Sequence, residues 1–347
     1  MGNLQELVET ARALVAPAKG ILAADESSGT IKRRFDAIGV ESTEQNRRDY
    51  RELLFRTPGA ANYISGVILY DETIRQKGAD GTPLVKVLQD QGVIPGIKVD
   101  AGTKPLTFAE GELVTEGLDG LRERFAEYYQ LGARFSKWRA VITIGEGIPS
   151  DYCIEVNTHA LARYAALSQE AGIVPIVEPE VLMDGDHSIE ACLDATTRTL
   201  HELYHQLAHQ RVKLEGTLLK PNMVLSGNKA LNRAPANEVA RLTVDCFKAT
   251  VPAAVPGIVF LSGGQSDDEA TVNMDAIARY GQQAGAPWQL SYSFGRGLQA
   301  APQKAWSGKP ENVAAAQAAF HHRAKVTSAA RQGQYTPAME AELAGAR

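Results

Sequence analysis

The 347 residues would fit two average domains, but an α/β barrel of this length often forms a single domain. Hydrophobic residues make up 44% of the chain, which allows a sizeable core. A net charge of −5 argues against a general surface for nucleic acid or anionic membrane, so any polyanion would have to bind locally.

Short apolar runs alternate with helical patterns along the chain. Eight runs are predicted to be strands, at 20–24, 63–70, 95–100, 134–144, 173–178, 216–220, 257–261 and 289–294. Periodic segments between them predict helices at 43–56, 83–91, 118–131, 150–171, 188–210, 235–250 and 267–283. This alternation predicts a closed (β/α)8 TIM barrel. An open doubly wound sheet is the alternative, although no G-x-G-x-x-G follows the first strand.

The remaining segments lie at the two ends of the chain. We expect one domain over 1–347, with the barrel at about 19–306, extra helices at 4–15 and about 309–330, and a mobile tail at 332–347. The first residues include acids rather than a basic start and an apolar block, so no signal peptide is predicted. No apolar run approaches the length that spans a membrane.

The chain has three cysteines, Cys153, Cys192 and Cys246. Their odd number and wide separation match neither a disulfide framework nor the spacing of zinc ligands. We therefore expect a cytoplasmic protein without a membrane partner.

A lysine ends the sixth apolar run, where Lys220 is followed at once by Pro221. An ammonium group at the mouth of a buried strand must be paired, lose its proton, or react as a neutral amine. A neutral amine is a nucleophile toward carbonyl groups. The structural alternative is a lysine that caps the strand and reaches to solvent.

Other charged residues lie at the carboxyl ends of predicted strands, the face where barrel enzymes carry their chemistry. They are Asp25, Lys98, Asp100, Glu178, Glu180 and Arg296. Lys137 and Arg139 lie two residues apart inside the fourth strand, so both side chains should face the same side. Any one of these residues could belong to a structural ion pair, but the whole set at one rim indicates an active site.

Glycines and basic residues predict two anion pockets. Ser262-Gly263-Gly264 and Gly295-Arg296 follow the seventh and eighth strands, where barrels commonly bind phosphate. Ser27, Thr30 and Arg34, with Lys98 nearby, predict a second pocket across the mouth. For this second segment the alternative is an ordinary helix cap followed by a solvated basic face.

The segment from His201 to His205 matches the zinc motif H-E-x-x-H, with His209 one turn further on. The apolar stripe of this helix includes Leu200, Leu203 and Leu207. At about 100° per residue, His205 and His209 point away from that stripe toward solvent. We therefore regard the match as chance and predict no metal site.

From about Lys19 to Pro337 the chain resembles the class I fructose-bisphosphate aldolases. The motifs that carry the resemblance are Gly20-Ile-Leu-Ala-Ala-Asp-Glu-Ser, Gly96-Ile-Lys-Val-Asp, Ser136-Lys-Trp-Arg, Val177-Glu-Pro-Glu, Thr217-Leu-Leu-Lys-Pro-Asn-Met, Leu261-Ser-Gly-Gly-Gln-Ser and Ser293-Phe-Gly-Arg. The resemblance implies reversible cleavage of fructose 1,6-bisphosphate to dihydroxyacetone phosphate and glyceraldehyde 3-phosphate in glycolysis and gluconeogenesis. It also implies a homotetramer that needs no cofactor.

The resemblance implies a role for each site residue. Lys220 would form the Schiff base, Glu178 would be the main acid and base, and Lys137 would assist near the carbinolamine. Asp25 would lie beside the carbon-4 hydroxyl, supported by Glu180 and Arg139. The carbon-1 phosphate would be bound around Ser262, Gly263, Gly264, Gly295 and Arg296, and the carbon-6 phosphate by Ser27, Thr30, Arg34 and Lys98.

The chain departs from the family pattern in two places. Thr30 stands where a serine is usual, and Tyr335 is the last tyrosine, whereas many members end in one. Two other functions stay open at this point. A transaldolase-like lyase would not need two phosphate pockets, and a non-catalytic scaffold would not need Lys220, Glu178 and Lys137 together. The sequence also leaves open the preference among fructose 1,6-bisphosphate, fructose 1-phosphate and sedoheptulose 1,7-bisphosphate.

Overall fold

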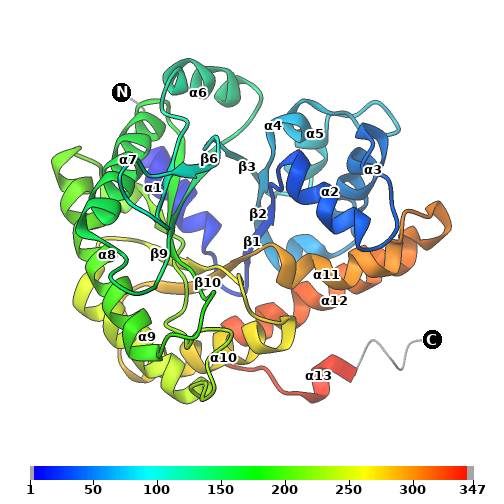
Figure 1. The fold of residues 1–347 in the computed structure, drawn as a ribbon. Helices are drawn as coiled ribbons and strands as arrows, with labels where there is room; N and C mark the ends of the chain where they lie inside the picture. The colour runs from blue at the N-terminus through cyan, green and yellow to red at the C-terminus, as the bar shows by residue number, and fades with distance from the viewer. Residues whose placement is uncertain (1–3, 342–347) are drawn as a thin grey trace.

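Eight parallel strands close into a barrel in this computed structural model, which describes residues 4–341. In order around the barrel they are β1 (Gly20–Ala24), β2 (Ile64–Leu69), β3 (Ile94–Lys98), β6 (Phe135–Ile142), β7 (Val174–Val181), β8 (Leu218–Leu219), β9 (Gly257–Phe260) and β10 (Gln289–Phe294). Helices surround the strands (Figure 1). The predicted (β/α)8 barrel is confirmed.

The surrounding helices follow the strands along the chain. They are α2 (Ser28–Asp36), α3 (Glu44–Phe55), α4 (Asp71–Arg75), α5 (Leu84–Gln89), α6 (Leu121–Gln130), α7 (Asp151–Glu170), α8 (Ile189–His209), α9 (Ala236–Thr250), α10 (Asp267–Gln283), α11 (Arg296–Trp306) and α12 (Val313–Arg331). Hydroxyl caps fix where several of them begin, because a side-chain oxygen accepts an otherwise unpaired amide of the first turn. Ser150 caps α7 in this way and Ser188 caps α8.

Several elements differ from the sequence prediction. A two-stranded antiparallel sheet of β4 (Thr103–Pro105) and β5 (Leu113–Thr115) lies between β3 and β6 in the chain, and neither strand was predicted. Helices α2, α4 and α11 were also not predicted as helices. The strand β8 has only two residues, because Leu214–Gly216 forms a 3-10 turn instead of extended chain. By contrast, β7 extends to Val181 and so carries both Glu178 and Glu180.

The inside of the barrel is filled by inward-facing side chains of the strands. Phe135, Ile176 and Val259 belong to this cluster. The Phe135 ring lies against Gly96, where an added Cβ would be 2.3 Å from the ring. Helix α1 (Leu4–Leu14) contributes Leu7, Ala11 and Leu14 to the same cluster and so closes the amino-terminal end of the barrel. The carboxyl-terminal end is left for the site.

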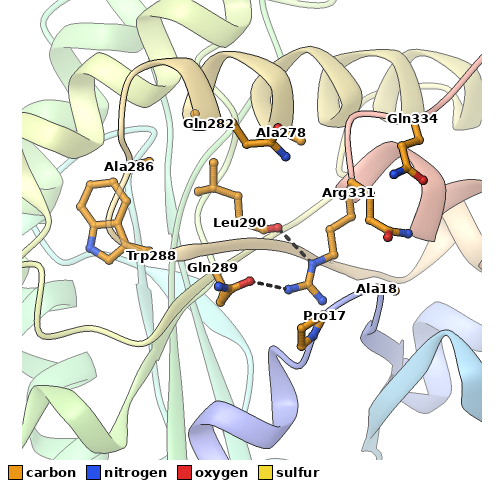
Figure 2. A pocket seen from close by; sticks show the side chains of 12 residues that line it. Pro17, Ala18, Ala278, Gln282, Ala286, Trp288, Gln289, Leu290, Arg331 and Gln334 are labelled. Atoms are coloured by element: carbon orange, nitrogen blue, oxygen red, sulfur yellow. Dashed lines mark hydrogen bonds between the residues drawn. The ribbon is translucent and has the colours of Figure 1, made fainter.

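The side chain of Arg331 joins α12 to this closed end. It is 6% exposed, and it donates hydrogen bonds to main-chain oxygens of Val15, Ala16 and Lys19 before β1. It also donates to the main-chain oxygen of Leu290 and to the side-chain oxygen of Gln289, which are neighbours in β10 (Figure 2). A cavity of about 440 Å³ lies beside it. Because these five acceptors use its donors, Arg331 acts as a structural clamp.

The segment after α12 was expected to be a mobile tail. As far as it is described, it packs on the protein and contains a short helix, α13 (Ala338–Ala341). The amide of Tyr335 donates to Asp275 Oδ1 at 2.9 Å, and Arg323 Nη1 lies 2.6 Å from Glu340 Oε2. The rest of the predicted tail, 342–347, lies outside the described residues. Across residues 4–341, no helix combines the length and apolarity needed to cross a membrane.

Candidate active site

A cavity of about 680 Å³ opens at the carboxyl ends of the strands. It brings together every residue that the sequence singled out for the site: Asp25, Ser27, Thr30, Arg34, Lys98, Asp100, Lys137, Arg139, Glu178, Glu180, Lys220, Ser262, Gly263, Gly264, Gly295 and Arg296. These residues come from seven loops or strands that are far apart in the chain, and closure of the barrel makes them neighbours.

Lys220 follows β8 directly, and its backbone is fixed while its side chain enters the cavity. Its amide donates to the main-chain oxygen of Val177 at 2.8 Å. The residue is 4% exposed, and its Nζ lies 3.2 Å from Oε1 of Glu178. The snorkelling alternative is wrong, since the amine is buried and faces a carboxylate.

Glu178 lies between two lysines. Its Oε1 faces Lys220, and its Oε2 lies 3.3 Å from Nζ of Lys137 on β6. Glu178 is 3% exposed, so no bulk water separates the three groups. A carboxylate in this position can pass a proton between whatever is bound to one amine and the other.

Lys137 is surrounded by negative charge. Its Nζ lies 2.8 Å from Asp25 Oδ2, 3.3 Å from Glu178 and 4.0 Å from Asp100 Oδ2. Burial by itself would lower the pKa of Lys137, but these carboxylates outweigh burial and raise it above its ordinary value. Lys137 therefore remains an ammonium ion and is a poor nucleophile.

Asp25 is the opposite partner of this ion pair. Burial by itself would raise the pKa of Asp25, but the charges of Lys137 and Lys220 outweigh burial and hold that pKa below its ordinary value. The Asp25 side chain is 13% exposed and faces the cavity as a carboxylate.

Arg139 and Glu180 form a further pair at the rim. Arg139 Nε donates to Glu180 Oε2, and the Arg139 amide donates to Asp100 Oδ2 at 3.2 Å. Burial would lower the pKa of Arg139, but Glu180 overcomes this and raises it. Gly263 lets the chain pass close to this pair, because an added Cβ would lie 2.8 Å from Glu180 Oε1. As predicted from the period of a strand, Arg139 and Lys137 both face the cavity.

The first predicted anion pocket is formed by the loops after β9 and β10. Ser262 is 5% exposed, and its Oγ accepts a hydrogen bond from the Gly297 amide at 3.4 Å. Gly264 has φ +79°, which favours glycine. Arg296 is the first residue of α11 and donates to the main-chain oxygen of Gln265 at 2.7 Å. The pocket therefore combines a helix start, a glycine turn and a guanidinium group.

The second predicted pocket lies on the other side of the mouth, at the start of α2. Ser27 caps this helix and accepts from the Thr30 amide at 3.4 Å. Arg34 lies one turn further along α2 and lines the cavity. Lys98 reaches the same region from β3, with its Nζ 3.1 Å from Asp100 Oδ1. The helix cap that was the structural alternative is present, and it lies within the cavity.

One acidic residue of the site, Glu26, was not singled out by the sequence analysis, and another, Asp100, was singled out at the rim but was given no role there. Asp100 contacts Lys98, Lys137 and the Arg139 amide. Its position at the end of Gly96-Ile-Lys-Val-Asp, directly after a strand, was the signal that placed it at the rim. Glu26 is 7% exposed and also lines the cavity, and its position directly after Asp25 gave only a weak signal.

The histidines of the H-E-x-x-H match point outward, as predicted. His201, His205 and His209 are exposed, while Leu200, Leu203 and Leu207 of the same helix are buried. Among residues 4–341, no group of three or more His, Cys, Asp and Glu side chains is placed to hold a metal ion.

The geometry is that of a barrel enzyme with a buried lysine flanked by an acid and by anion pockets. Known proteins have similar sequences. The family model described as fructose-bisphosphate aldolase class-I matches residues 6–347. The chain is 57% identical to a "Probable fructose-bisphosphate aldolase class 1" of Xanthomonas campestris over 96% of this chain and 99% of that protein. It is 54% identical to "Fructose-bisphosphate aldolase 4, cytosolic" of Arabidopsis thaliana, over 95% of this chain and 84% of that protein.

A solved structure agrees with these matches. Fructose-bisphosphate aldolase from Plasmodium falciparum, crystallised with TRAP and a small-molecule inhibitor, superposes with a TM-score of 0.94 at 48% identity, covering 96% of this chain and 95% of that one. The chain therefore belongs to the class I fructose-bisphosphate aldolase family. Its activity is that of a lyase, the reversible cleavage of fructose 1,6-bisphosphate into two triose phosphates in glycolysis. The transaldolase-like and scaffold alternatives are set aside by this assignment.

Proposed function

We propose that the cleavage runs through a Schiff base on Lys220. The observation that carries the proposal is the position of Glu178 between two lysines in unlike surroundings. Lys137 is held as an ammonium ion by three carboxylates, whereas Lys220 has Glu178 as its ion-pair partner among the described residues. Lys220, with a single carboxylate partner that can take up its proton, is therefore the better candidate for the nucleophile that attacks the carbonyl.

In the first half of the reaction, the amine of Lys220 adds to carbon 2 of the open-chain ketose to give a carbinolamine. Glu178 takes the proton that Lys220 loses on becoming a neutral amine and returns it to the departing hydroxyl, so water leaves and a protonated imine forms. The nearby charge of Lys137 supports this loss of water, since it stabilises the carboxylate that Glu178 becomes.

In the second half, Asp25 accepts the proton of the carbon-4 hydroxyl and the bond between carbons 3 and 4 breaks. The electron pair moves into the imine, which becomes a neutral enamine, and glyceraldehyde 3-phosphate leaves as the aldehyde. Protonation of the enamine at carbon 3 and addition of water then release dihydroxyacetone phosphate and free Lys220. Glu180 and Arg139 support Asp25 in this step.

The two anion pockets hold the ends of the substrate in this proposal. Ser262, Gly263, Gly264, Gly295 and Arg296 bind the carbon-1 phosphate, and Ser27, Thr30, Arg34 and Lys98 bind the carbon-6 phosphate. Both phosphates lie away from the bond that breaks, so their binding energy can orient the reacting carbons.

We also propose that the protein assembles as a homotetramer and is located in the cytoplasm. The Arabidopsis relative that carries the word "cytosolic" in its name supports the location, and the resemblance to the family supports the assembly. The net charge of −5 gives no support to a nucleic-acid partner. Analytical ultracentrifugation of the purified chain measures the assembly, and a sedimenting monomer would contradict it.

The decisive experiment traps the Schiff base. Borohydride added to enzyme and dihydroxyacetone phosphate should give one covalent adduct per chain, because a protonated imine is reduced to a stable amine. Peptide mapping should place the adduct on Lys220. The variant Lys220→Arg keeps the charge but has no amine that deprotonates, so it should lose both trapping and cleavage.

Lys137→Arg is the matched control for the trap. It keeps the permanent charge beside Glu178 and should still give the adduct on Lys220. An adduct on Lys137, or cleavage without any adduct, would show that the proposed mechanism is wrong.

A further inference from the structure

Glu26 is a buried carboxylate at the mouth of the barrel to which the mechanism gives no role. It follows Asp25 directly, lies 7% exposed and lines the cavity on the side of the second anion pocket. A buried carboxylate next to an anion pocket works against anion binding unless cations neutralise it.

One oxygen of Glu26 accepts two hydrogen bonds. Arg34 Nη1 donates to Oε1, and Gln299 Nε2 donates to the same oxygen at 2.7 Å. Within residues 4–341, the side chain of Arg34 makes no other hydrogen bond, and it is 25% exposed. One guanidinium nitrogen is therefore fixed on Glu26, while the remaining donors are left for a ligand in the cavity.

Gln299 is itself held in one orientation. Its Oε1 accepts from the hydroxyl of Tyr50 at 3.1 Å, and its Nε2 also donates to the main-chain oxygen of Ala23 at 2.7 Å. Burial raises the pKa of Tyr50, so its hydroxyl stays protonated and continues to donate. The amide of Gln299 consequently presents a donor, and not an acceptor, to Glu26.

A second cation lies behind Glu26. Arg51 is 1% exposed, donates to the main-chain oxygen of Glu26 at 2.8 Å, and has Nη2 3.9 Å from Glu26 Oε2. Its other carboxylate neighbour is Glu72, at 3.7 Å. Arg34 and Arg51 both lie within ion-pair distance of Glu26, so the contact with Arg34 is a charge-assisted hydrogen bond.

We propose that Glu26 is a positioning residue that aims Arg34 at the carbon-6 phosphate and so favours bisphosphate substrates over monophosphates. The inference rests on the proposed function, in which Arg34 contacts that phosphate. An arginine that is oriented before the substrate arrives loses less side-chain freedom on binding and presents its donors in a fixed plane. Glu26 itself does not touch the substrate.

The test compares two substrates in the variants Glu26→Gln, Arg34→Ala and the double variant. Glu26→Gln should raise KM for fructose 1,6-bisphosphate by roughly tenfold, the effect of losing one charge-assisted hydrogen bond. The kcat value and all constants for fructose 1-phosphate should stay within about twofold. Borohydride trapping with dihydroxyacetone phosphate should also be unchanged, which shows that the variant is folded. The double variant should be no worse than Arg34→Ala, because Glu26 acts only through Arg34.

Glu72→Gln is the matched control, since it removes the other carboxylate near Arg51 without touching Arg34. Any change in KM that it causes should be the same for both substrates. A selective rise in KM for the bisphosphate, as large as that in Glu26→Gln, would overturn the inference. Additive effects in the double variant, or equal losses on both substrates in Glu26→Gln, would overturn it as well. If Arg34→Ala shows no bisphosphate-selective loss, the pocket assignment itself is wrong. If Arg34→Ala shows that loss and Glu26→Gln does not, only the inference about Glu26 is wrong.

Discussion

The Nζ atom of Lys137 lies 2.8 Å from Oδ2 of Asp25, and the two side chains are 4% and 13% exposed. The pKa of Lys137 is raised above its ordinary 10.5, and that of Asp25 is lowered below its ordinary 3.8. The cation contributes stability that is lost only as pH rises through its raised pKa, and the carboxylate contributes stability that is lost only as pH falls through its lowered pKa. Between about pH 4 and pH 10 the contribution of the pair is therefore complete.

Removing the cation should make stability depend on pH. In Lys137→Met, three buried carboxylates lose their shared partner, so we expect a loss of about 3–5 kcal/mol in the free energy of unfolding at pH 7. The deficit relative to the wild type should shrink at pH 5, because carboxylates left without the cation protonate more readily in the folded variant. Urea unfolding at the two pH values measures both effects.

Lys86→Met is the control for this experiment. Lys86 on α5 pairs with Asp90 directly after that helix, and both side chains are more than half exposed. Its loss should change stability by less than about 0.5 kcal/mol at either pH. If the stability lost in Lys137→Met were larger at pH 5 than at pH 7, the assignment of Lys137 as the cation shared by these carboxylates would be wrong.

The two phosphate pockets should be separable by substrate. Arg296→Ala should weaken fructose 1,6-bisphosphate and fructose 1-phosphate alike, whereas Lys98→Ala should mainly weaken the bisphosphate. Truncation of a charged contact in a desolvated site costs about 2–5 kcal/mol. Values of kcat/KM for both substrates measure the effect, and equal penalties for both substrates in the Lys98 variant would refute the assignment of its pocket.

Cleavage should proceed without a metal ion. The proposed reaction uses the imine as its electron acceptor, and the histidines of the H-E-x-x-H match face solvent. Extended dialysis against a strong chelator should leave the cleavage rate unchanged, and the double variant His201→Ala/His205→Ala should match the wild type. Activity that is lost on dialysis and restored by zinc would count against Schiff-base chemistry.

Arg331 should matter for stability and not for turnover. Arg331→Met keeps an unbranched side chain but leaves buried main-chain oxygens of Val15 and Leu290 without their donor, so several kcal/mol of stability should be lost. Thermal unfolding measures the loss, and KM measured well below the transition should be unchanged. Gln334→Ala, at the border of the same cavity, should leave both values unaltered. A raised KM in the arginine variant would show that the closed end of the barrel affects the site.

The strands were predictable because a parallel barrel buries both faces of each strand, which leaves continuous apolar runs between helical periods. Helix α11 escaped prediction because the residues around its start, Gly295-Arg296-Gly297, resemble an anion loop and Pro302 lies inside the helix. The β4 and β5 pair escaped because Thr103–Pro105 and Leu113–Thr115 are too short to show a period. Among the predicted strands the boundaries shifted most at β7, which stays paired with β6 as far as Val181, beyond the predicted end at 178.

The membership of the site was predictable in the same way, since strand ends at one rim must converge when the barrel closes. The contacts that these residues make with one another were not predictable. That Glu178 uses one oxygen for each lysine, and that Asp100 joins four cationic or amide groups, depends on side-chain directions that no spacing encodes. The link from Tyr50 through Gln299 to Glu26 joins residues more than 200 positions apart, so it required the fold.

The cavity has a charge balance opposite in sign to that of the whole chain. Seven basic residues and five acidic ones line it, while the chain as a whole carries a net charge of −5. A multiply charged substrate is therefore repelled by most of the surface and attracted at the opening, which guides its diffusion toward the reacting lysine. Dissolved salt screens such guidance over about 8–10 Å, so the encounter rate of the bisphosphate should fall as ionic strength rises, while that of an uncharged sugar should hardly change.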